Sequence, residues 1–150
     1  MKSVSEQKKL LRDLFESQKL AVLATHSEGQ PYANLMAFAA TKDLKNLIVA
    51  TTRSTRKFTN LSADSRVARL FDNRSNTVRD FCSAITVTAT GIAGEVEPRD
   101  RKRLQRLYLA KHPHLEDFVT SLNCALVRIR VNTYYIVTRF QNVMELHLGT

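Results

Sequence analysis

The sequence predicts a mainly β protein with flanking helices, built on an antiparallel β-barrel of six or seven strands. Short apolar runs of strand length follow one another along the chain, with polar turn residues between them. Short strands separated by regular turns favour a barrel over an open sheet. The sequence shows no long crossover connections of the kind that a parallel sheet needs, so we expect antiparallel pairing.

Size and composition predict one soluble domain spanning residues 1–150. The apolar share is 43% and the charged share 25%, both ordinary for a globular protein. No apolar run has the length of a membrane span, and the polar start of the chain has no signal-peptide core. We therefore expect a cytoplasmic protein without membrane contact. Its cysteines, Cys82 and Cys124, are expected to be reduced and to bind no metal.

The net charge of +9 raises the question of an anionic partner. The densest run of cations lies between Arg99 and Arg106, where helical spacing indicates a solvated helix face. No interleaving of aromatic and basic residues of the RNA-binding type is present, nor a zinc-finger or helix-turn-helix pattern. Nucleic acid is therefore not the expected partner.

The first half of the chain predicts a helix followed by a three-strand meander. Ser3 and Glu6 have the spacing of a capping box, which starts an amphipathic helix. Gly29 suits the turn of a hairpin because glycine readily adopts positive φ. The predicted elements are a helix over 3–18 and strands over 20–25, 31–40 and 47–51.

The second half predicts further strands and three helices. Gly91 and Gly94 indicate a bulge or a close backbone approach in the longest strand. Pro98 suits the first residue of a helix, and Asn132 with Thr133 is expected to be a turn. The predicted elements are helices over 54–63, 98–111 and 114–120, and strands over 66–71, 83–96, 124–131 and 134–140. The last ten residues are apolar enough to add an edge strand or to dock on a partner.

The residues after the third strand have the composition of a phosphate site. The run Thr52-Arg53-Ser54-Thr55-Arg56-Lys57 joins the strand to a short helix. The free N–H groups and the dipole of a helix N-terminus attract anions, and Arg and Lys add charge. The alternative for this segment is a solvated basic turn, and residue types alone do not separate the two.

The sequence contains no motif for catalysis by side chains alone. It lacks a GxGxxG or Walker loop, and its four histidines are scattered. His112 and His114 flank Pro113, which is poor geometry for one metal ion and favours a helix-end pair. If the protein is an enzyme, a bound cofactor is expected to carry the chemistry.

The runs LAVLATHSEGQPYANLMAFA, LIVATTRSTRKFTNL and RVARLF resemble the pyridoxamine 5′-phosphate oxidase-like family. The resemblance implies an FMN-binding split barrel and a homodimer with FMN at the subunit interface. Arg56 and Lys57 should bind the FMN phosphate, helped by Ser54 and Thr55. The flavin should be lined by Thr51, by Asn34, Leu35, Met36 and Ala37, and by Thr86 from the partner subunit.

The chain departs from the named oxidase, since it has no Trp and ends in FQNVMELHLGT. It resembles the short single-domain relatives, which include flavin and deazaflavin reductases and haem-utilisation proteins. We therefore expect an FMN-dependent oxidoreductase, with the small-molecule substrate and electron donor unidentified. The alternatives are a deazaflavin protein, a non-catalytic flavin or haem carrier, and a barrel that binds nucleic acid through its basic helix.

Overall fold

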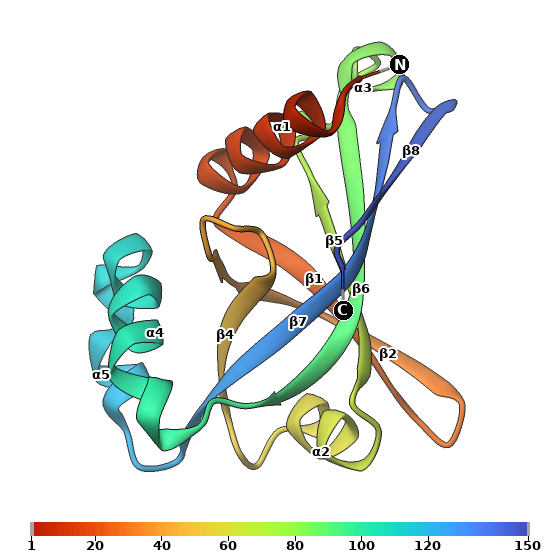
Figure 1. Cartoon of the computed structure of the whole chain (residues 1–150). Coiled ribbons are helices and arrows are strands. Elements are labelled where there is room, and N and C mark those ends of the chain that lie inside the picture. The colour runs from red at the N-terminus through yellow and green to blue at the C-terminus, as the bar shows by residue number, and fades with distance from the viewer. Residues whose placement is uncertain (1, 150) are drawn as a thin grey trace.

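The computed structural model describes residues 2–149, and within them every strand belongs to one antiparallel sheet (Figure 1). The order of the strands is β2-β1-β5-β6-β7-β4-β3, with β8 paired to β7. The strands are β1 Leu20–Ser27, β2 Gln30–Ala37, β3 Ala39–Ala40, β4 Asn46–Thr52, β5 Arg66–Asp72, β6 Ile85–Glu95, β7 Cys124–Thr138 and β8 Asn142–His147. The helices are α1 Val4–Ser17, α2 Arg56–Ala63, α3 Asp80–Ser83, α4 Pro98–Lys111, η1 Pro113–Leu115 and α5 Glu116–Thr120.

The sheet curls into a split barrel because one segment of chain supplies both of its ends. β2 pairs with β1, and β3, which begins two residues later, pairs with β4. The bend lies at Phe38, a fully buried residue between the two strands. The predicted single strand over 31–40 is therefore two short strands, and the meander is two hairpins. The predicted antiparallel split barrel is confirmed.

The predicted turn at Asn132 and Thr133 is wrong, because β7 runs without a break from Cys124 to Thr138. This strand lies in the middle of the sheet and pairs with β4, β6 and β8 along its length. Asn132 itself has no Cα partner, because it is the extra residue where the register between β6 and β7 shifts. Its neighbours hold it in an extended strand despite its preference for turns, since Val131 pairs with Gly91 and Thr133 pairs with Thr90 and His147. The Thr90 hydroxyl also donates a hydrogen bond to Asn132 Oδ1 over 2.7 Å.

The predicted irregularity in β6 is present at Gly91. The register with β7 shifts between Thr90 and Gly91. A Cβ atom at Gly91 would lie 2.3 Å from the carbonyl oxygen of Arg130, so only glycine fits this contact without a backbone shift. The close approach coincides with the register shift between the two strands.

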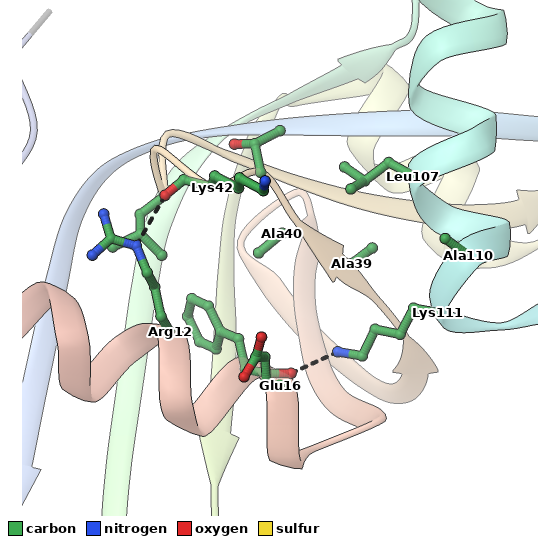
Figure 2. A pocket seen from close by; sticks show the side chains of 11 residues that line it. Arg12, Glu16, Ala39, Ala40, Lys42, Leu107, Ala110 and Lys111 are labelled. Atoms are coloured by element: carbon green, nitrogen blue, oxygen red, sulfur yellow. Dashed lines mark hydrogen bonds between the residues drawn. The ribbon is translucent and has the colours of Figure 1, made fainter.

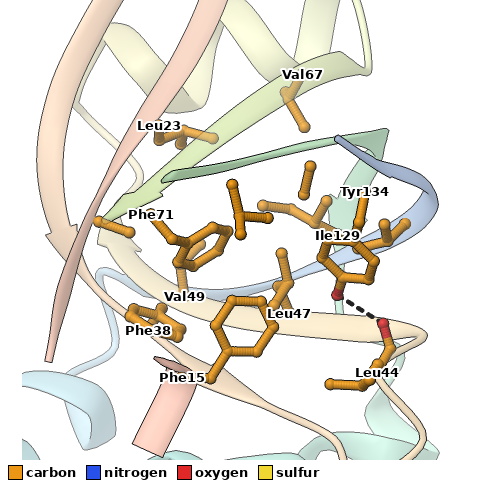
Figure 3. Close-up of a cluster of buried hydrophobic side chains, with 14 of the residues drawn as sticks. Phe15, Leu23, Phe38, Leu44, Leu47, Val49, Val67, Phe71, Ile129 and Tyr134 are labelled. Carbon is orange, nitrogen blue, oxygen red and sulfur yellow. Dashed lines mark hydrogen bonds between the residues drawn. The ribbon is translucent and has the colours of Figure 1, made fainter. Parts of the chain in front are cut away.

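α1 closes one side of the barrel and completes its core (Figure 3). Ser3 and Glu6 form the predicted capping box at its N-terminus. Phe15 of α1 packs against Phe71 at 4.5 Å and against Phe38 at 5.7 Å between ring centroids. The hydroxyl of buried Tyr134 donates to the Leu44 carbonyl over 2.7 Å, which satisfies the one polar atom of that ring.

α4 and α5 cover the other side of β4 and bury a second, smaller core. Leu104 and Tyr108 of α4 pack with Val119 of α5 against Ile48 and Leu126 of the sheet. The predicted helical turn after residue 113 is present as η1 and α5. No helix within residues 2–149 is long and apolar enough to cross a membrane.

Candidate functional site

The predicted phosphate site lies where β4 ends and α2 begins. Thr55 is the N-cap of α2, and its hydroxyl accepts a hydrogen bond from the Phe58 N–H at 3.4 Å. The same hydroxyl lies 3.0 Å from the hydroxyl of buried Thr51. The backbone of Thr55 is extended, as is typical of a capping residue. The first N–H groups of a helix have no partner within the helix. Thr51 and Thr55 therefore shape the turn, with their hydroxyls bonded to each other.

Arg56 and Lys57 occupy the first two positions of α2, at the positive end of its dipole. Neither side chain has a carboxylate partner within residues 2–149. Burial lowers the pKa of Lys57, whose side chain is partly covered, while Arg56 and Ser54 are exposed. Unpaired cations next to free helix N–H groups form an anion-binding arrangement.

Arg53, the third cation of the turn, points elsewhere. Its guanidinium donates to the carbonyl oxygens of Leu122 and Cys124, and it forms a 2.5 Å ion pair with Glu95. These contacts tie the end of β4 to the start of β7. Arg53 is a structural cation, and its charge is already neutralised.

The side chain of Arg56 bridges the split in the barrel. Its guanidinium carbon lies 5.7 Å from the ring centroid of Tyr32 on β2, although β2 and β4 are not paired as strands. β2 is an edge strand that pairs with β1 alone, so its other edge keeps free backbone donors and acceptors. The candidate site therefore combines a cationic helix start with an unpaired strand edge. Sequence reasoning missed Tyr32, which carries no signal until the two segments meet.

The β2 residues predicted to line a flavin divide between two faces of the sheet. Asn34 and Met36 lie opposite Leu23 and Ala21, whose side chains fill the barrel, and Met36 is itself buried. Leu35 and Ala37 point to the outer face. Asn34 Oδ1 is buried and has no hydrogen-bond partner among the described residues. An unpartnered buried oxygen in this place is an acceptor open to a ligand donor.

Thr86 is on the outer face of β6, and β1 and β5 separate β6 from β2. Its Cα partners are Asp72 and Val137, and none of the other predicted site residues neighbours it in the register. One copy of the chain therefore does not bring Thr86 together with Arg56 and Lys57. The predicted contact of Thr86 with a flavin in the partner subunit requires a second copy of the chain, and it stays a prediction.

The histidines do not assemble a metal centre. His112 is buried, and its Nε2 lies 2.7 Å from the Phe38 carbonyl oxygen. Burial also lowers its pKa. His114 is exposed at the start of the next helical turn. Within residues 2–149 no cluster of His, Cys, Asp and Glu side chains has the geometry of a metal site.

A family model described as pyridoxamine 5′-phosphate oxidase matches residues 7–138. The chain belongs to the pyridoxamine 5′-phosphate oxidase family. The matched region runs from α1 to the end of β7 and includes the split and the α2 turn. No curated protein matches the sequence closely enough to count as a relative.

Solved structures confirm the split-barrel fold. A heme binding protein from Mycobacterium smegmatis superposes with a TM-score of 0.83 at 17% identity, covering 98% of this chain and 59% of that protein. General Stress Protein 26 from Bacillus anthracis gives 0.68 at 22% identity, covering 95% and 98%. An FAD-binding protein from Mesorhizobium loti gives 0.69 at 15% identity, covering 85% and 90%. The chain thus spans about three fifths of the length of the Mycobacterium smegmatis protein.

Proposed function

We propose that this protein is an FMN-binding oxidoreductase of the family's short, single-domain type. The observation that carries the proposal is the unpaired Arg56 and Lys57 at the capped N-terminus of α2, next to the free edge of β2. Family membership supports it, because it makes a flavin the first candidate for the anion.

The residues present fit FMN. Arg56 and Lys57 would hold the phosphate together with the first N–H groups of α2, and Ser54 is exposed beside them. Two cations in adjacent positions repel each other, and a dianionic phosphate relieves that repulsion. Asn34 Oδ1 and the free backbone groups of β2 offer acceptors and donors to a heterocycle.

When bound, FMN supplies the redox chemistry, since flavins exchange hydrides or electrons without a catalytic acid or base from the protein. This chain's residues then have to bind the phosphate, orient the ring and exclude water. A small-molecule substrate and an electron donor such as a reduced nicotinamide complete the proposal.

We propose further that the protein is a homodimer whose interface is the outer face of the sheet. The cross-strand row Leu35, Val22, Leu70, Thr88 and Tyr135 carries no charged side chain. Leu35 is 61% exposed and Leu70 39% exposed in the single chain. An uncharged row that exposes two leucines favours burial against another protein surface. A second copy placed there would bring its Thr86 toward this chain's β2.

The dimer is tested by Leu70→Glu, which puts a carboxylate at the centre of the row in both copies. We expect dissociation to monomers in light scattering at micromolar concentration, because burying an unpaired carboxylate is unfavourable. Leu122→Glu is the matched control, since Leu122 is 96% exposed in the loop after α5. A wild-type monomer, or a dimer that Leu70→Glu leaves intact, contradicts this interface.

The cofactor is tested by the visible absorption spectrum of the purified protein, followed by release and mass analysis of its chromophore. We expect an FMN spectrum that bleaches with a reduced nicotinamide. A coloured protein that stays inert toward every donor would instead be a carrier. A Soret band would replace flavin by haem, which the Mycobacterium smegmatis neighbour binds. Release of a deazaflavin would leave the assignment of the phosphate site unchanged and would identify a different ring system as the cofactor.

A further inference from the structure

A second pocket lies away from the α2 turn, between α1, α4 and the turn that connects β3 to β4 (Figure 2). Its volume is about 370 Å³, which is the size of a small-molecule site. The turn over 41–45 precedes β4 and α2 follows this strand, so the pocket and the proposed phosphate site lie toward opposite ends of β4 (Figure 1). No residue of α2 lines the pocket.

The inner wall of the pocket is apolar. Small side chains leave the space open: Ala39 and Ala40 come from β3 and Ala110 from α4. Phe15, Leu44 and Leu107 complete this wall. Such a surface suits the body of a small apolar molecule, and it gives a bare inorganic ion nothing to contact.

The rim of the pocket is cationic. Arg12, Lys42 and Lys111 reach it from three different elements, against the one carboxylate of Glu16 (Figure 2). Arg12 Nε donates to the Lys42 carbonyl at 3.1 Å, and Lys111 Nζ donates to the Phe15 carbonyl at 2.7 Å. Within residues 2–149, none of these three cations forms an ion pair with a carboxylate. The side chains of Arg12 and Lys111 are therefore held at the pocket by neutral carbonyl acceptors.

The buried cation Arg69 adds to the positive charge near Lys111 that no carboxylate neutralises. Arg69 is fully buried, its Nε and Nη1 atoms have no partner, and its guanidinium carbon lies 5.7 Å from the Phe38 ring centroid. Lys111 Nζ lies 3.8 Å from the centroid of the same ring. Burial, and then the charge of Arg69, lower the pKa of Lys111 to about 8. An anion beside Lys111 would relieve this strain between like charges.

We propose that this pocket binds a small apolar carboxylate, with its carboxyl group at the cationic rim beside Lys111 and its apolar body against the alanines of β3 and α4. A carboxylate matches the planar fork of Arg12 and the single ammonium of Lys111. The apolar wall favours an organic acid over free phosphate. The proposal is independent of the flavin site, because it uses none of the residues assigned there.

The test is a titration of the full-length protein with benzoate, followed by two-dimensional amide NMR, with benzyl alcohol and inorganic phosphate as comparison probes. Benzyl alcohol keeps the ring without the charge, and phosphate keeps the charge without the ring. We expect saturable shifts from benzoate at the pocket residues, with a Kd on the order of 1 mM for so small a ligand. The two comparison probes should bind at least about tenfold more weakly.

Two variants locate the site. Lys111→Met removes the charge and keeps most of the aliphatic stem, whereas Ala110→Phe fills the pocket from an exposed position and leaves every charge in place. Each should weaken benzoate binding about tenfold or more. Lys102→Met, on the exposed face of the same helix, is the matched control and should bind like the wild type.

The proposal also predicts that bound benzoate raises the pKa of Lys111, measured on its side-chain nitrogen. This readout separates an ion pair at Nζ from a merely structural role of the lysine. Absence of saturable shifts, equal binding of benzyl alcohol, or full affinity in Ala110→Phe would each overturn the proposal. Loss of FMN binding in Arg56 and Lys57 variants would leave it untouched.

Discussion

Two pairs of cations in this protein differ in how far water reaches them. Arg56 and Lys57 begin α2, where one side chain is exposed and the other partly covered. Arg69 is fully buried and Lys111 half-buried, both close to the Phe38 ring. Neither pair has a carboxylate partner within the described part of the chain. Water still reaches both side chains of the first pair, whereas in the second pair Arg69 has lost all contact with water and Lys111 part of it.

This difference shows which clusters of cations can be predicted from a sequence. Arg56 and Lys57 are adjacent in the chain and follow a capping threonine, so local pattern alone predicts a phosphate site. Arg69 and Lys111 come together only because β5 and α4 pack around the same ring. A buried cation without a partner destabilises the fold, while a hydrated one does not. The two pairs should therefore respond differently to substitution.

The largest stability difference is expected from replacing one cation of each pair by methionine. Arg69→Met keeps the volume and removes a buried charge whose single hydrogen bond, to the Ala21 carbonyl, is 3.3 Å long. We expect a gain of about 1–2 kcal/mol in the free energy of unfolding, which exceeds the lost contacts with the Phe38 and Phe71 rings. Arg56→Met should change it by less than about 0.5 kcal/mol.

Urea denaturation of both variants checks this prediction. The burial of Arg69 lowers its pKa to about 9, so it is still charged at neutral pH, where the comparison is made. If Arg69→Met instead destabilises the protein, the guanidinium is satisfied by a buried water or anion, and the contrast between the two pairs fails.

A smaller effect is expected at the cap of α2. Thr55→Ala removes the hydroxyl that accepts from the Phe58 N–H and contacts Thr51, and should lower the free energy of unfolding by about 1 kcal/mol. Thr55→Ser keeps the hydroxyl and should behave like the wild type. Thermal unfolding measures both, and equal melting temperatures for the alanine and serine variants would show that the cap does not hold the turn.

The smallest effect is the pH dependence that Lys111 contributes. Burial lowers the pKa of Lys111 in the native state to about 8 from its ordinary value of 10.5, so between these values the unfolded chain holds a proton that the folded chain has released. Stability from this group therefore rises with pH across that window. Because Lys111 is only half-buried, the rise should be below about 1 kcal/mol.

Lys111→Met isolates this contribution, since Arg69 titrates in both proteins. The difference in the free energy of unfolding between wild type and variant should shift in favour of the wild type as the pH increases from 8 toward 10.5. A difference that stays constant with pH would mean that Lys111 is well hydrated, which removes one argument for the buried pair.

The parts of the fold predicted correctly depend on local signals. The capping box of α1, the Gly29 turn, the helix start at Pro98 and the crowded Gly91 each reflect constraints that neighbouring residues impose. The predicted turn at Asn132 and Thr133 was wrong because the strand pairs of Val131 and Thr133 keep the backbone extended through the unpaired Asn132.

The candidate site likewise has features that local sequence predicts and features that depend on tertiary packing. The helix start with Arg56 and Lys57 follows from local spacing. The contact with Tyr32 and the opposite orientations of Asn34 and Leu35 depend on how the strands pair and where the barrel splits. Those relations arise from tertiary packing, and no short segment of the sequence encodes them.

The most direct test of the central claim compares FMN with riboflavin, which lacks the phosphate, in wild type and in the double variant Arg56→Ala/Lys57→Ala. We expect FMN affinity to fall by at least about 100-fold, because two charge-assisted contacts are lost, and riboflavin affinity to change only a few-fold. Lys102→Ala/Arg106→Ala removes the same charge from exposed positions of α4 and should leave both affinities unchanged. Equal losses for FMN and riboflavin would contradict the assignment of the α2 start as the phosphate site.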